Sequence, residues 1–196
     1  MMPTMQRFLT AWFVTIALVS SVAAAPNKKK FHFDLAEVTA KPTIKPALAK
    51  AATARVETQV RRAFETHPQL VAKLDGAPDW KTAADAYRKF LASKGLAGAY
   101  HVTVDITEAT EEVVAMEGRT NTQRLVVRVA IHMLGETMPG RTMGFTGEGQ
   151  ATIKQEIGRT LHDRDRQYAW DSAAEAAIAD AMGTVFKQLA VPQNKQ

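Results

Sequence analysis

The stretch RLVVRVAIHML, residues 124–134, decides the fold because its side chains alternate strictly along the chain. Its odd-numbered positions are all apolar, whereas Arg124, Arg128 and His132 occupy even-numbered positions. This period of two is typical of a β-strand with one buried and one solvated face. A shift of one residue would bury both arginines and the histidine, so we expect the apolar positions to face the core. The expected core-facing residues are Leu125, Val127, Val129, Ile131 and Met133.

Two other stretches show the same kind of alternation. AYHVTVDITE, residues 99–108, has apolar side chains at its even positions from Tyr100 to Ile106. TMGFTGEGQATIK, residues 142–154, keeps a weaker pattern that glycines dilute. A turn at EGRTN, residues 117–121, would join the first of these to the central stretch as a hairpin. QLVAKL, residues 69–74, is a further candidate for a short strand.

Two amphipathic segments precede these strands. The first is predicted to begin at Pro46, because proline suits the first turn of a helix, and to end at His67 and Pro68. Apolar side chains recur along it at every fourth position, which predicts one buried stripe. The second is predicted to follow Asp79 as its N-cap and to end at Gly95.

The last helix is predicted to begin at Ser172, because Ser172 and Glu175 have the spacing of a capping box. Three helices with one apolar stripe each need a shared partner, and the apolar face of the sheet provides it. The sequence therefore predicts an α+β fold. Its form is a two-layer sandwich in which a mostly antiparallel, twisted sheet of about four strands carries three helices on one face.

This order of elements resembles a class of bacterial envelope domains. The resemblance rests on ALAKAATARVETQVRRAF, FLASKGLAGAYHVTVDIT, RLVVRVAIHML and GRTMGFTGEGQATIK, followed by an alanine-rich helix. The pattern is similar to the N-terminal domain of the TolB translocation protein, the curli secretion lipoprotein and the penicillin-binding-protein activator lipoproteins. It covers roughly residues 46–190 and implies a non-catalytic interaction module. Unlike those lipoproteins, the chain has no cysteine to carry a lipid.

The N-terminal residues are typical of an export signal. Arg7 gives a short positive start, FLTAWFVTIALVSSV supplies an apolar core, and SVAAA offers a cleavage site. We therefore expect residues 1–25 to be a signal peptide and the protein to be periplasmic or secreted. The alternative is an uncleaved membrane anchor, because Lys28, Lys29 and Lys30 follow the apolar run.

The composition of the rest of the chain predicts its domain boundaries. Residues 26–45 contain prolines and lysines and are expected to form a flexible tether. Within this tether, FHFDLAEV, residues 31–38, alternates briefly, and this leaves an edge strand as an alternative. Residues 46–191 are expected to form a single domain, and residues 192–196 a disordered tail.

The charge balance bears on the partners of the protein. The chain has 25 Lys and Arg against 20 Asp and Glu, and this mild net charge of +5 does not favour nucleic-acid binding. Weak attraction to an anionic surface is expected through Lys28, Lys29 and Lys30. The predicted partner is an envelope protein or a cell-wall component. The lack of cysteine excludes disulfides.

The expected hairpin brings polar side chains together. A turn centred between residues 118 and 119 sets Asp105 opposite His132 and Glu136 opposite His101. Such pairs are the usual decoration of an exposed sheet face, and this is the interpretation that we favour. The alternative is a small-ligand or metal-binding periplasmic protein that binds zinc through His101, Asp105 and His132.

The sequence predicts no catalytic residue and no cofactor. It contains neither a G-x-S-x-G nucleophile motif nor the GK[ST] ending of a phosphate loop. The polar run HDRDR, residues 162–166, is expected to be a solvated loop because arginines alternate with its carboxylates. We therefore expect a non-enzymatic envelope protein whose partner face includes Arg124, Arg128 and His132.

Overall fold

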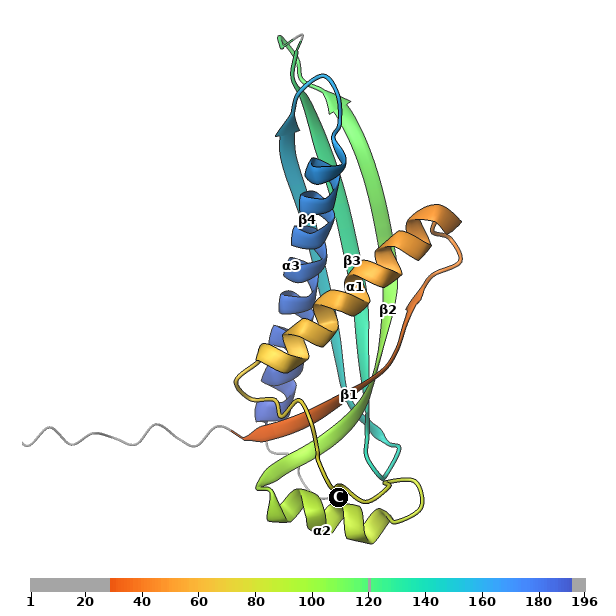
Figure 1. The fold of residues 1–196 in the computed structure, drawn as a ribbon, viewed down its shortest axis with the longest axis vertical. Helices are drawn as coiled ribbons and strands as arrows, with labels where there is room; N and C mark the ends of the chain where they lie inside the picture. Colours follow the sequence, from red (N-terminus) through yellow and green to blue (C-terminus); the bar gives the residue numbers. More distant parts are fainter. Residues whose placement is uncertain (1–28, 120, 192–196) are drawn as a thin grey trace, which may run out of the picture.

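A computed structural model describes residues 29–119 and 121–191 of the chain (Figure 1). The predicted signal peptide, residues 1–25, and the predicted tail, residues 192–196, lie outside these ranges. In chain order the elements are β1 (Lys30–Ala40), α1 (Pro46–Thr66), α2 (Ala84–Ser93), β2 (Leu96–Ala115), β3 (Gln123–Thr137), β4 (Met143–Ile157) and α3 (Asp163–Ala190). No helix in the described part is long and apolar enough to cross a membrane.

The predicted α+β class is confirmed. The strands form one sheet in the order β1-β2-β3-β4, with β1 parallel to β2 and the other neighbours antiparallel. The central strand β3 orients its side chains as its alternation predicts, since Arg128 is exposed while Leu125 and Val127 are completely buried. The buried residues on this face of β3 are Leu125, Val127, Val129, Ile131 and Met133.

Helices α1 and α3 cover the apolar face of the sheet (Figure 1). Helix α1 begins with Pro46 and ends before His67, as expected, and buries the predicted stripe. The backbone of α3 packs in close contact with the backbone of β4. Gly147 and Gly149 allow this approach because they have no side chain between the two backbones. A Cβ added at Gly149 would lie 2.6 Å from the backbone nitrogen of Ala181. These glycines explain why β4 has the weakest alternation of the three predicted strands.

The tether prediction for residues 26–45 is wrong over its described part. Residues 30–40 form β1, whose Phe31 and Phe33 are each only 4% exposed in the core. Burial of each phenylalanine contributes about 1.5–3 kcal/mol, and this favours a strand docked on the sheet over a free tether. The alternative of an edge strand was the correct one.

The start predicted for the last helix is also wrong. Helix α3 begins at Asp163, so Ser172 lies inside it rather than at its N-cap. Two acidic residues in the first turn, Asp163 and Asp165, favour this earlier start through the helix dipole. The run 162–166 is therefore mostly helical rather than a solvated loop.

Helix α2 packs away from the other two helices. Its Tyr87 and Leu91 join Ala99 and Met138 in a second small core at one end of the sheet. It begins at Ala84, five residues after Asp79, which instead forms a turn by accepting the backbone N–H of Lys81 at 2.9 Å. The segment 69–74 is irregular and makes only an isolated bridge to β1.

Candidate functional site

The strand register brings the predicted polar residues together on the face of the sheet opposite α1 and α3. Asp105 lies opposite His132, and His101 lies opposite Glu136, as predicted. His132 in turn lies opposite Glu148 on β4. Asp105, His132 and Glu148 therefore form one row across three strands, which we call the central row.

A β-bulge in β2 makes this register possible. The register between β2 and β3 shifts between Ile106 and Glu108, so Thr107 is an extra residue on β2. Between the bulge and the turn, the pairs differ by one residue from the predicted ones. Val113 lies opposite Leu125, whereas the predicted turn centre would set it opposite Arg124. Bulges of this kind bend a strand and increase its twist. The sequence did not reveal this bulge.

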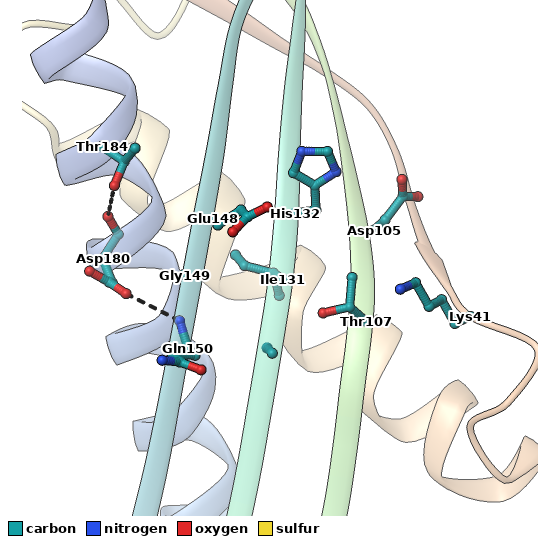
Figure 2. Close-up of a pocket in the computed structure, with 11 residues that line it drawn as sticks. Lys41, Asp105, Thr107, Ile131, His132, Glu148, Gly149, Gln150, Asp180 and Thr184 are labelled. Carbon is teal, nitrogen blue, oxygen red and sulfur yellow. Dashed lines mark hydrogen bonds between the residues drawn. The ribbon is translucent and has the colours of Figure 1, made fainter.

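The central row lines an open groove of about 620 Å³ (Figure 2). Figure 2 shows Lys41 at the β1 side of the groove, and Asp180 and Thr184 on α3 at its other side. The groove therefore combines residues from the first and the last elements of the domain. Its lining residues include Lys41, Asp105, Thr107, His132, Glu148, Gln150, Asp180 and Thr184.

Two of the three carboxylates in the groove are already hydrogen-bonded. The Asp105 carboxylate accepts the hydroxyl of Thr39, and Asp180 accepts the backbone N–H of Gln150 at 3.2 Å. Within the described residues, no hydrogen bond or ion pair engages the side chain of His132 or Glu148. These two adjacent groups are therefore available to a molecule that enters the groove.

The three zinc candidates do not converge. His101 lies four residues before Asp105 on β2. It pairs with Asp34 instead, with 3.1 Å between Nδ1 and the carboxylate oxygen. The ring of Trp80 also lies near it, at 5.8 Å between centroids. No group of three or more His, Cys, Asp or Glu side chains in residues 29–119 and 121–191 is arranged to hold a metal ion.

The two predicted arginines lie further along the polar face. Arg128 is exposed, and its guanidinium lies 4.0 Å from the carboxylate of Glu112. Arg124 is half-buried and lies opposite Glu156 in the register of β3 with β4. Both therefore extend the same face as the central row, but they lie outside the residues that line the groove.

No protein-family model and no curated protein matches the sequence. Solved structures with a similar chain path include a protein of Caulobacter crescentus assigned as a lipoprotein, with 12% identity and a TM-score of 0.47 over 83% of this chain and 93% of that chain. Rare lipoprotein B of Shewanella oneidensis has 6% identity and a TM-score of 0.39 over 81% and 96%. A minor lipoprotein of Acinetobacter baumannii has 11% identity and a TM-score of 0.36 over 84% and 98%. Similarity at this level carries no argument about function.

Sequence reasoning missed the two walls of the groove. Lys41 was assigned to the tether, and Asp180 and Thr184 lie on the exposed side of a helix that was considered only for its buried stripe. No local pattern marks these residues as neighbours of the central row. Their positions follow from the way β1 and α3 pack on the sheet.

We expect the side chains of the polar face to contribute little to the free energy of unfolding. We expect His132→Ala and Arg128→Ala each to lower the free energy of unfolding by about 0–1 kcal/mol. Arg128 is in an exposed charged pair, which is worth no more than this, and His132 has no hydrogen bond or ion pair in the described residues to lose. For a domain of this size the melting temperature should fall by at most about 2–4 °C. Differential scanning calorimetry measures this shift. A loss several times larger would show that the central row is structural.

Proposed function

We propose that this protein is an exported, non-catalytic interaction module of the bacterial cell envelope whose partner docks on the polar face of the sheet. The observation that carries the proposal is the open groove along the central row, in which His132 and Glu148 have no partner in the described part of the chain. The predicted signal peptide and the resemblance to envelope domains support the location.

The charges of the groove indicate which partner suits it. Asp105, Glu148 and Asp180 contribute three carboxylates, whereas Lys41 contributes one amine. Complementary charge steers association and disfavours wrong partners. The partner is therefore a protein segment with basic side chains that lies across the strands.

Site-specific photo-crosslinking in the native host tests this proposal. A photoreactive residue at Glu148 should capture one envelope protein, whereas the same residue at Lys50, which is exposed on α1, should not. The substitutions Asp105→Asn and Asp180→Asn, combined with a crosslinker at Glu148, should reduce the yield several-fold and weaken its dependence on salt.

Two results would contradict the proposal. One is capture of the same proteins with the same yield from Lys50 as from Glu148. The other is calorimetric binding of zinc that His132→Ala abolishes, which would make the central row a metal site instead of a docking face.

A further inference from the structure

The upper part of β2 has a strand neighbour on one side only. Its pairing with β1 ends where Ala40 meets Ile106, but its pairing with β3 continues to Ala115 (Figure 1). Figure 1 shows β2 extending well past the end of β1. Within the described residues, the outer edge of residues 108–115 is therefore not covered by another strand. We call this segment the open edge.

The protein covers parts of its other two sheet edges with its own groups. Along β4, the backbone N–H groups of Thr146 and Gln150 donate to the side chains of Gln188 and Asp180 on α3, at 3.1 and 3.2 Å. Along β1, the backbone of Phe31 is hydrogen-bonded on its outer side by residues 69–71. No comparable hydrogen bond from the described residues reaches the backbone of the open edge. Uncovered edges are templates for pairing with another strand.

The side chains of the open edge favour contact with an apolar surface. Val113 and Val114 are 45% and 46% exposed and point to opposite faces of the sheet. The two neighbouring carboxylates are already compensated inside the molecule. Glu111 accepts the Nε1–H of Trp170 at 2.7 Å and pairs with Arg166 at 2.9 Å, and Glu112 lies 4.0 Å from Arg128. At residues 111–115 a partner therefore needs apolar contacts rather than basic groups.

We propose that the open edge pairs with the open edge of a second copy of the chain. The two β2 strands would lie antiparallel about a two-fold axis perpendicular to the sheet, as in a closed symmetric dimer. This axis keeps the helices of both copies on the same side of the joined sheet. In such a pair, directly opposed residues point to the same face of the sheet. Because successive residues of a strand point to opposite faces, the axis must pass between a residue and its own copy in the second chain.

The charges select which residue lies on the axis. An axis at Glu111 or Glu112 sets identical carboxylates opposite each other, which destabilises a strand pair. An axis at Thr110 sets Glu108 opposite Glu112. An axis at Val114 sets Glu111 opposite Glu117.

An axis at Val113 avoids every such pair. Val113 then lies opposite its own copy, and Glu112 lies opposite Val114, so both exposed valines are covered. The shared stretch, residues 111–115, stops short of Ile106, where β1 occupies the edge. Because the stretch is only five residues long, we expect a dimer that forms and dissociates with concentration.

The lack of cysteine in the chain makes a direct test possible. Directly opposed residues in antiparallel strands have Cα atoms about 4.5–5.5 Å apart, within reach of a disulfide. Under mild oxidation, Val113→Cys should therefore form a covalent dimer in high yield. Val114→Cys is the matched control, because the residue is equally exposed but lies opposite Glu112. It should crosslink at least several-fold less.

Two measurements decide the outcome. Sedimentation of the unmodified chain should show a concentration-dependent dimer, and Val113→Lys should make it monomeric while leaving its melting temperature within a few degrees. The inference is overturned by a parent chain that stays monomeric at every concentration. Equal crosslinking of the Val113→Cys and Val114→Cys variants, which would indicate random collision, also overturns it. This dimer uses a different surface from the polar groove, so its failure leaves the proposed function untouched.

Discussion

Val127→Asp is expected to unfold the domain. Val127 lies in β3, is completely buried, and faces the layer formed by α1 and α3. An unpaired carboxylate at this position loses its hydration and gains no partner, which costs several kcal/mol, and the apolar burial of the valine is lost as well. Domains of this size have a total stability of only about 5–15 kcal/mol. Near-UV circular dichroism and urea unfolding should show loss of the cooperative transition.

Thr152→Asp provides the control for this substitution. Thr152 is exposed on the polar face, directly opposite Arg128 in the neighbouring strand. A carboxylate there gains an opposite charge across the strands, so the free energy of unfolding should change by no more than about 1 kcal/mol. If Val127→Asp unfolds as cooperatively as Thr152→Asp and at a similar urea concentration, the assignment of the two faces of β3 is incorrect.

Gly149→Ala is expected to have the second-largest effect. A methyl group at this position would overlap the carbonyl oxygen of Ala177 and lie 2.6 Å from the backbone nitrogen of Ala181. Both obstacles are backbone atoms of α3, so a change of side-chain rotamer cannot relieve the overlap. Displacement of the helix would disturb the contacts of Ile178 and Val185 with the core. We expect a loss at or above the upper end of the usual overpacking range of about 1–3 kcal/mol.

Gly183→Ala tests the same substitution where space is available. Gly183 lies in α3, and an added Cβ meets nothing within 4 Å. Alanine is favoured over glycine inside a helix by about 1 kcal/mol, so this variant should be more stable than the parent. The two variants should therefore shift the urea midpoint in opposite directions. A stabilising Gly149→Ala would mean that α3 does not lie against β4 as closely as the structure shows.

Periodicity was sufficient to predict the layers of the fold. The alternation in β3 and the four-residue repeat in α1 come directly from the geometry of strands and helices, so each element reveals its buried face without its neighbours. The boundaries were less predictable. Ser172 and Glu175 match a capping box, but the hydrogen bonds and packing of Arg166 and Trp170 against Glu111 extend α3 toward the N-terminus. Such tertiary contacts override local signals at helix ends.

Half of the candidate site was predictable. The pairing of Asp105 with His132 was predicted from a turn centred between residues 118 and 119. It is correct because the bulge at Thr107 compensates for the one-residue difference in register next to the turn. The walls of the groove were not predictable, because Lys41, which follows the end of β1, and Asp180 on α3 approach the central row from distant parts of the chain. The proximity of residues so far apart in sequence has no local signature.

The sequence by itself determined the buried faces of β3, α1 and α3 and the antiparallel hairpin of β2 and β3. Each of these properties depends on the spacing of apolar residues within one segment. Only the tertiary structure decided that residues 30–40 join the sheet as β1, and that α3 lies against Gly147 and Gly149. It also decided that β1 stops at Ala40 and leaves the upper part of β2 open. These outcomes depend on which of several distant segments packs on a given edge or face of the sheet. The free energy of each arrangement depends on contacts between segments, which no single segment of the sequence contains.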